Sequence, residues 1–366
     1  MNFDIRPDPD MRHEQNYIRL PQRLREELGV IFGQFLQLQG KEELVLQVWN
    51  SPASENNIAY ISSENFEKIK GISVEFKILD VTIGCDPEYF IIYRNQLISA
   101  ATYLPFSGQI GCDGTLGELR PQYGKHERQV VANLQNLIPQ IPYRMKRSQW
   151  ARSLPKDGRD FQLEAHSYYA QLPAGFHVHL GIPPEILNTR KDFNRVAMNH
   201  IVQCLDWYVG VPLVPLEVSH QRRVGGGQYG RPGDYRPSNL TLEYRVPGAF
   251  YLRSPALAEG LLGLCLLVAE NIVSRLKVAS QGFVKLHKMT KADLNEILPI
   301  PEPDKIRGTM LAPNISTAQR ELDGIRKQLG TLASYGKHRE GIERFFRIVE
   351  TKERPRADLL HNWKER

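Results

Sequence analysis

"IGCDPEYFIIY", residues 83–93, places two carboxylates directly before a run of residues that is typical of a buried β-strand. Asp86 and Glu88 lie on either side of a proline, and the apolar and aromatic residues 89–93 follow. A charged group that enters a sheet core without a partner is strongly unfavourable. Another part of the chain must therefore supply a group that compensates the charge of Glu88.

Strand-like and helix-like segments follow each other in an irregular order around this stretch. Strand patterns cover residues 81–93, 97–104, 114–124, 174–182 and 240–250, and helical patterns cover 127–141, 192–214 and 254–276. The hairpin-like strand pairs favour an α+β fold, with an antiparallel sheet flanked by helices, over a doubly wound parallel sheet. We predict a small β-rich N-terminal domain over 1–80, a catalytic domain over 81–280, and a helical C-terminal extension with a basic tail over 281–366.

The composition indicates an ordinary globular protein and excludes several other classes. The chain has 366 residues, of which 41% are hydrophobic and 24% charged. The four cysteines lack C-x-x-C spacing, which fits a reducing compartment and excludes a zinc knuckle. The formal charge of +6 comes from dispersed basic residues, so nucleic-acid binding is not expected. We find neither a signal peptide nor an apolar run long enough to span a bilayer, and we expect a cytoplasmic protein without membrane contact.

Four strand-like segments each carry charged or imidazole groups at positions i and i+2, which share one face of a strand. The four pairs are Asp86 with Glu88, Glu118 with Arg120, His177 with His179, and Glu243 with Arg245. Each pair alone has a simpler explanation: an Asp-Pro turn, surface ion pairs, or histidines with satisfied hydrogen bonds. If all four lie on one face of one sheet, they suit a divalent cation and a phosphate better than a packed core.

A glycine-rich loop, residues 224–239, precedes the segment that contains Glu243. It matches neither a Walker motif nor a dinucleotide-binding motif. The loop could be a flexible hairpin connection. Alternatively, the loop could cover nucleotide phosphates or an acidic substrate with the four arginines around it, Arg222, Arg223, Arg231 and Arg236.

Four motifs occur together in an order that resembles a known family. They are "GCDPEYF" (84–90), "IGCDGTLGELRP" (110–121), "GFHVHLG" (175–181) and "YGRPGDYRPSNLTLEYRVP" (229–247). In this order and approximate spacing, the motifs resemble the carboxylate–amine ligase (amidoligase) family, which is often found in tailed bacteriophages. That family is related to glutamine synthetase and glutamate–cysteine ligase. The resemblance covers residues 81–276 and leaves both ends of the chain outside it.

The resemblance implies a glutamine-synthetase-like catalytic sheet that binds ATP and Mg²⁺. It implies metal ligands at Asp86, Glu88, Glu118, His177 and Glu243. It implies contacts with the nucleotide at His177, His179, Arg231 and Arg236, and catalytic contacts at Arg120, Arg236 and Arg245. Asp86 stands where relatives often have a glutamate, and Phe176 stands where they commonly have a second glycine.

The resemblance also implies a reaction in which a carboxylate is phosphorylated by ATP and the acyl phosphate is then attacked by an amine. The substrates would be a small-molecule or peptide carboxylate and an amine, in the host cytoplasm if a phage encodes the protein. Two other functions stay open. One is a phosphotransferase on the same fold that stops at the phosphorylated product. The other is a non-catalytic phage structural or nucleic-acid-associated protein.

Overall fold

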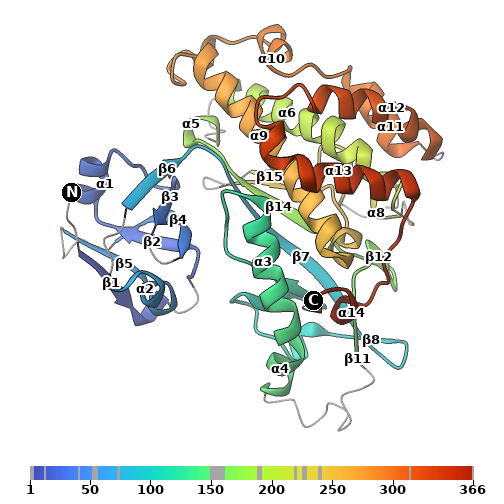
Figure 1. Cartoon of the computed structure of the whole chain (residues 1–366), viewed down its shortest axis with the longest axis horizontal. Coiled ribbons are helices and arrows are strands. Elements are labelled where there is room, and N and C mark those ends of the chain that lie inside the picture. The colour runs from blue at the N-terminus through green and yellow to red at the C-terminus, as the bar shows by residue number, and fades with distance from the viewer. Residues whose placement is uncertain are drawn as a thin grey trace.

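The computed structural model shows two β-sheets and a set of helices packed against the larger sheet (Figure 1). It describes residues 4–364 except 12–13, 40–41, 52–56, 72–74, 149–160, 188–191, 218–220, 225–228, 238–240 and 313–314. The described residues confirm the predicted α+β class, with an antiparallel sheet flanked by helices and a β-rich N-terminal region. The division into three domains, 1–80, 81–280 and 281–366, stays a prediction.

The N-terminal part forms a six-stranded mixed sheet with strand order β1-β5-β2-β4-β3-β6. Its strands are β1 (Asp4–Asp8), β2 (Tyr17–Leu20), β3 (Phe35–Gln39), β4 (Glu43–Asn50), β5 (Ile58–Ser62) and β6 (Glu75–Leu79). Two short helices, α1 (Gln22–Leu28) and α2 (Ser63–Ile69), accompany the sheet. Buried aliphatic side chains such as Ile18, Leu46 and Ile61 form a separate small core. In Figure 1 this unit lies to one side of the larger sheet.

The second sheet has the order β15-β16-β14-β7-β10-β9, and β8 and β11 also pair with β7. All these pairings are antiparallel. The strands are β7 (Thr82–Tyr93), β8 (Gln96–Ile98), β9 (Ile110–Asp113), β10 (Leu116–Leu119), β11 (Phe161–Glu164), β14 (Phe176–Gly181), β15 (Tyr235–Pro237) and β16 (Leu242–Tyr244). A two-stranded ribbon, β12 (Tyr168–Tyr169) with β13 (Leu172–Pro173), lies apart from them.

The central strand β7 passes unbroken through the proline of the opening stretch. The predicted strand over 81–93 is confirmed, whereas the Asp-Pro turn is wrong. Pro87 is the last residue that pairs with β14, and the pairing with β10 begins at Glu88. The missing N–H of proline thus falls where one pairing ends and the other begins, which limits its cost to the sheet.

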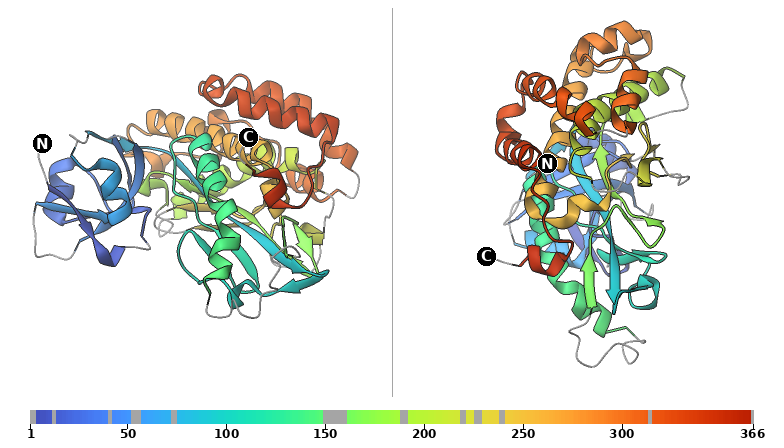
Figure 2. Two further views of the ribbon diagram at one scale, coloured as in Figure 1. Left: turned by 60° about the horizontal axis from the view of Figure 1, so that its bottom comes forward. Right: turned by 90° about the vertical axis from the view of Figure 1, so that its right-hand side faces the viewer.

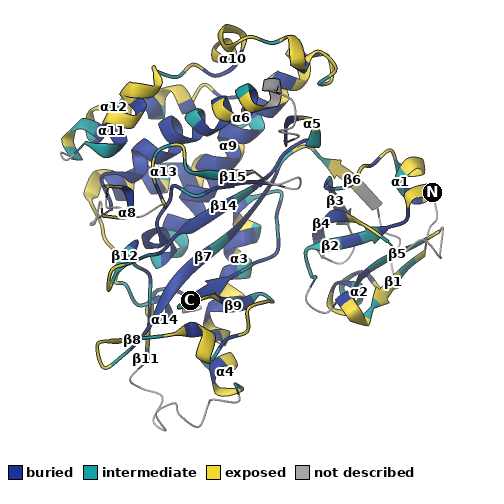
Figure 3. Ribbon diagram, turned by 180° about the vertical axis from the view of Figure 1, so that it is seen from behind, coloured by how far each residue is buried: buried dark blue, intermediate teal, exposed yellow. Residues whose placement is uncertain are grey.

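Helices cover one face of this sheet, and the charged residues lie on the other face, beside a small hydrophobic cluster that contains Phe90 and Ile92. α3 (Glu127–Leu137) and α9 (Pro255–Ala279) contact β7, and α9 also contacts β14. On that face Cys85, Tyr89 and Ile91 join the main hydrophobic core. Figure 2 shows the helical layer from two further sides. In Figure 3, which views the molecule from the opposite side to Figure 1, β7 is nearer the viewer than α3. The even-numbered residues of β7 therefore point away from the helices.

The helix α9 is long and apolar enough to cross a membrane, so the expectation that no apolar run reaches that length was wrong. In the structure, 89% of its most apolar window is buried against the rest of the chain. As predicted, it is a core helix.

The remaining helices surround α9 and extend to the C-terminus (Figure 1). They are α4 (Ile141–Lys146), α5 (Pro184–Leu187), α6 (Asp192–Leu205), α7 (Val211–Leu213), α8 (Gln221–Val224), α10 (Lys291–Ile297), α11 (Pro303–Leu311), α12 (Ile315–Leu329), α13 (Tyr335–Thr351) and α14 (Leu359–Asn362). The single helix predicted over 192–214 is interrupted by a π-helical turn, Asp206–Gly210. The predicted strand over 97–104 ends at Ile98.

Candidate active site

The antiparallel register brings the predicted charged residues onto one face of the second sheet. His177 on β14 pairs with Asp86 on β7, and His179 pairs with Glu243 on β16. On the other side of β7, Glu118 on β10 pairs with Glu88. Residues paired in this way share a face, so carboxylates and imidazoles from four neighbouring strands line the side that α3 and α9 do not cover.

Three of these residues form a compact group. Nδ1 of His177 lies 3.5 Å from Oδ1 of Asp86 and 3.7 Å from Oε1 of Glu243. One ligand atom from each residue lies within 4.8 Å of the other two. Both carboxylate oxygens are buried and have no hydrogen-bond partner among the described residues. The two buried oxygens and the imidazole nitrogen lie close together but form no hydrogen bonds with one another. Such a set of donor atoms fits a divalent cation.

Asp86 is held ionised by the two histidines. Nε2 of His179 lies 2.9 Å from its Oδ2. Burial alone would raise the pKa of Asp86, but His179 and His177 outweigh it and hold the pKa well below the ordinary value. Conversely, burial would lower the pKa of His179, and Asp86 raises it. His179 therefore keeps Asp86 ionised as a member of the group of three.

Glu88 lies one row further along the strand and outside that group. Its Oε2 accepts a hydrogen bond of 2.5 Å from the backbone N–H of Gly175. Burial raises its pKa, although His177, this N–H and the guanidinium of Arg222 oppose the rise. These three groups are the compensation that the sequence required for a carboxylate inside a sheet.

Glu118 and Arg120 form an ion pair with each other. Arg120 also donates to the backbone carbonyls of Gly108 and Cys112, at 3.2 and 3.3 Å. Burial lowers the pKa of Arg120. The pair thus joins β10 to the segment that leads into β9. The predicted role of Glu118 as a metal ligand and that of Arg120 as a catalytic contact stay predictions.

The predicted arginines gather around Glu243. Arg236, on β15 opposite Glu243, forms an ion pair with it through Nε, and Nε of Arg245 lies 3.3 Å from Oε1. Arg236 keeps 63% of its side chain exposed, so it can turn toward a ligand. Arg231 is exposed in the same loop. Residues 225–228 and 238–240 of the glycine-rich loop lie outside the described residues, so its proposed covering role rests on the arginines alone.

Two buried residues support the site in ways that the sequence did not predict: Arg222, which was expected only as one of the four arginines around the loop, and Asp206, which was assigned no role. Arg222 on α8 donates to the carbonyls of Val246 and Arg245, at 2.7 and 2.9 Å, and so fixes the end of β16. Asp206 accepts hydrogen bonds from the N–H of Gly233 and from the hydroxyl of Tyr244, at 2.6 and 2.8 Å. The arginines 222 and 223 beside the loop were a signal for the first. Nothing in the local pattern indicated the second.

Among the described residues, one other group of histidine and glutamate atoms is as compact: His126, Glu127 and His338. It lies among helices. His338 already bonds to two carboxylates there, at 2.7 Å to Glu127 and 3.1 Å to Glu270. These contacts explain the group as an interhelical ion-pair network.

Comparison with known proteins identifies one family and a number of distantly similar solved structures. The family model described as "Phage phiEco32-like COOH.NH2 ligase-type 2" matches residues 83–293, which is more than half of the chain. A search of curated protein sequences finds no match.

Among solved structures, the chain is similar to a bifunctional glutathione synthetase from Pasteurella multocida, with 12% identity and a TM-score of 0.34. That match covers 75% of this chain and 56% of the synthetase, so the chain spans about half the length of that protein. It is also similar to a novel glutamine synthase homolog, with 12% identity, a TM-score of 0.29, and coverage of 72% of this chain and 70% of the other. At TM-scores this low, neither structure carries an argument about this chain.

Proposed function

The chain belongs to the phage phiEco32-like COOH.NH2 ligase-type 2 family, and we propose that it joins a carboxylate to an amine in a reaction that depends on ATP and Mg²⁺. The observation that carries the proposal is the convergence of Asp86, His177 and Glu243, with two buried carboxylate oxygens that lack hydrogen-bond partners among the described residues. The arginines beside Glu243 add the positive charge that a phosphate requires.

The three residues fit a hard cation. Carboxylate oxygens are the preferred protein ligands of Mg²⁺, which usually keeps waters and substrate phosphates as its other ligands. Asp86, Glu243 and His177 would hold the ion, and Glu88 and Glu118 lie in the next row for a second contact. Bound there, Mg²⁺ would neutralise phosphate charge next to the transferring phosphoryl group.

In the proposed first step, a carboxylate oxygen of the substrate attacks the γ-phosphorus of ATP. The bond to the bridging oxygen breaks, and ADP leaves. The amine nitrogen then attacks the carbonyl carbon of the acyl phosphate, the C–O bond to phosphate breaks, and the amine proton passes to solvent. Arg236 and Arg245 would orient the phosphate and stabilise the charge that develops on it.

No nucleophilic side chain is needed for this reaction, and the cysteines are poorly suited to act as one. All four are buried. Burial raises the pKa of Cys85 well above its ordinary value, and its side chain faces the helical core rather than the charged face. The site therefore works by position and charge.

The test is ADP formation by the purified protein with Mg²⁺ and ATP, screened against pools of amino acids, polyamines and peptides. We expect ADP release that requires both an acid and an amine and that falls at least a hundredfold in Glu243→Gln. The matched control is Glu259→Gln, which changes another buried, arginine-paired carboxylate far from the site. A stable phosphorylated product without an amide would instead establish a phosphotransferase. Wild-type activity in Glu243→Gln would contradict a cation site at this position.

A further inference from the structure

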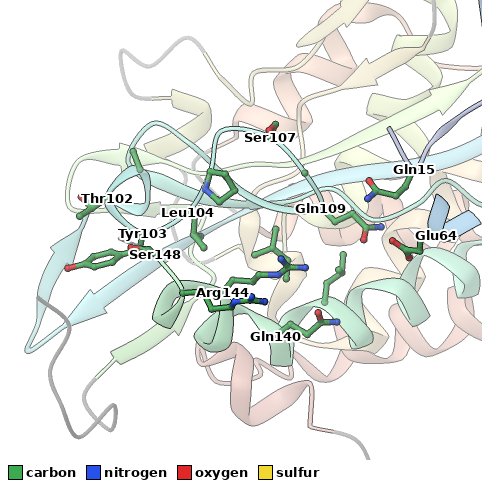
Figure 4. Close-up of a pocket in the computed structure, with 16 residues that line it drawn as sticks. Gln15, Glu64, Thr102, Tyr103, Leu104, Ser107, Gln109, Gln140, Arg144 and Ser148 are labelled. Carbon is green, nitrogen blue, oxygen red and sulfur yellow. The ribbon is translucent and has the colours of Figure 1, made fainter. Parts of the chain in front are cut away.

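A cavity of about 730 Å³ opens at the β9 edge of the catalytic sheet. Its walls come from three parts of the chain: the segment 101–110 that leads into β9, the α3–α4 region, and the N-terminal unit. The N-terminal unit contributes Gln15 and Glu64 (Figure 4). The cavity therefore lies where the small sheet meets the catalytic sheet, and it needs both.

The lining has the chemistry of a site for a peptide with a free carboxylate. Arg144 and Arg147 line the cavity, and neither pairs with a carboxylate among the described residues. The guanidinium of Arg147 lies 5.5 Å from the ring centroid of Tyr143, which restricts its position. Two unpaired guanidinium groups on one wall suit a single carboxylate.

The other groups favour a peptide over a polyphosphate. The side-chain amides of Gln15, Gln109 and Gln140 line the same space, and an amide both donates and accepts hydrogen bonds as a peptide bond does. Glu64 shares the cavity, and its negative charge would repel a chain of phosphates. Figure 4 shows Gln109, Arg144 and Glu64 around one open space.

The cavity lies on the helix-covered side of the β9 edge, because Leu104, Ile110 and Leu137, which line it, belong to the main hydrophobic core. A peptide bound there must therefore pass round this edge to reach the charged face. Gly108, which lines it, accepts the hydrogen bond from Arg120, whose partner Glu118 stands opposite Glu88. β9 is separated from β7 by β10 alone. Two strand spacings amount to roughly 10 Å, which about three extended residues can cover.

We propose that this cavity binds a short peptide, of about three residues, by its α-carboxylate through Arg144 and Arg147. The opposite end of the peptide then reaches the charged face. The inference rests on the proposed function, because it names the substrate class of the same ligase. It also gives the N-terminal unit a task as one wall of the substrate site.

The experiment compares Ala-Ala-Ala with the same peptide amidated at its C-terminus, by isothermal titration calorimetry without ATP. We expect the free acid to bind at least tenfold more tightly than the amide. In the double variant Arg144→Gln, Arg147→Gln the free acid should lose that advantage. The matched control Arg347→Gln, an exposed arginine on α13, should keep it. Because both arginines of the double variant are exposed, it should melt at the wild-type temperature.

Equal binding of acid and amide, no binding of either, or unchanged preference in the double variant would each overturn the peptide site. The measurement needs neither nucleotide nor turnover. If ADP formation is intact while the peptide does not bind, the peptide site is wrong and the ligase stands. If the peptide binds as expected but no ADP forms, the ligase fails and the binding site stands.

Discussion

The carboxyl group of Asp206 connects the glycine-rich loop to the core beneath the charged face. It lies in the π-helical turn, is 3% exposed, and accepts hydrogen bonds from Gly233 in the loop and from Tyr244 on β16. Within the loop, Asp234 continues the chain of contacts by accepting from the N–H of Gly230 at 2.6 Å. Asp206 therefore holds the backbone that carries Arg231 and Arg236.

Burial raises the pKa of Asp206 to about 7, against the pull of Tyr244, Gly233 and Arg223. A carboxyl group with a raised pKa in the folded state stabilises the fold below its unfolded pKa and loses that contribution as pH rises through the folded value. Wild-type stability should therefore fall between pH 5 and pH 8 by an extra amount on the order of 2 kcal/mol that Asp206→Asn lacks.

Urea unfolding of the two proteins at pH 5 and pH 8 measures this difference, because the contributions of all other groups cancel in the comparison. A wild-type-to-variant difference that stays constant with pH would show that Asp206 titrates normally. Tyr244→Phe serves as the control. It removes one of the two hydrogen bonds and leaves the titrating group in place.

At the scale of single residues, the sequence predicted part of the site. The i and i+2 spacing of Asp86 with Glu88 and of His177 with His179 indicated a shared face, and the strand register places them there. The spacing could not rank them: Asp86 joins the compact group, and Glu88 is satisfied by a backbone N–H. Asp206 was missed because its partners come from distant segments.

At the scale of elements, His338 joins three helices that are far apart in the sequence. It belongs to α13, is 1% exposed, and bonds to Glu127 on α3 and Glu270 on α9. Glu270 also pairs with Lys337. Burial alone would lower the pKa of His338, but the two carboxylates outweigh it and raise the pKa. The imidazolium thus joins α13 to α3 and α9.

His338→Asn should therefore cost more stability at pH 6 than at pH 9. The histidine's contribution is fully present below its unfolded pKa, near 6.5, and is lost as pH rises through the raised folded value. We expect the variant to lose on the order of 1–2 kcal/mol at pH 6, since it removes a charged partner from both Glu127 and Glu270. Chemical unfolding at both pH values measures it, with His361→Asn, an exposed histidine, as the control. An equal loss at both would contradict a charged His338.

The elements also show where periodicity stops being informative. The strand pattern over 81–93 correctly indicated β7, but the pattern alone could not exclude a turn at Pro87. Only the pairing partners on each side show why proline is tolerated there. Similarly, the helical pattern over 192–214 cannot reveal a π turn, because Asp206 enters the core to meet Tyr244 and Gly233 from other segments.

At the scale of the whole molecule, the N-terminal sheet is fitted against the start of β7 and the end of β14. The rings of Phe35 and Tyr123 lie 5.2 Å apart and edge to face. A Cβ at Gly84 would clash with the Tyr123 ring, and one at Gly181 would clash with Phe35. The sequence predicted the β-rich unit but not its docking, because glycines that make room for a ring from another segment leave no local pattern.

Glu43 supplies two of the polar contacts of this junction. It accepts a hydrogen bond of 2.7 Å from Gln129 and pairs with Lys125 at 2.6 Å. Glu43→Lys would remove the hydrogen bond from Gln129 and replace the ion pair with Lys125 by a repulsion. It should weaken docking by on the order of 1 kcal/mol, because these charges are only partly screened. Hydrogen exchange in β3, β4 and residues 124–129 should then be several times faster, and the loss should shrink at high salt.

The control is Glu42→Lys, since the neighbouring glutamate is 65% exposed and lies 4.0 Å from Lys68 within its own unit. It makes the same charge change without touching the catalytic part. If the two variants exchange alike, the ion pair does not hold the sheets together, and the other contacts of the junction, such as that of Phe35 with Tyr123, must do so. If only Glu43→Lys opens the junction, it should also weaken peptide binding in the cavity, because Gln15 and Glu64 move with the sheet that the junction holds.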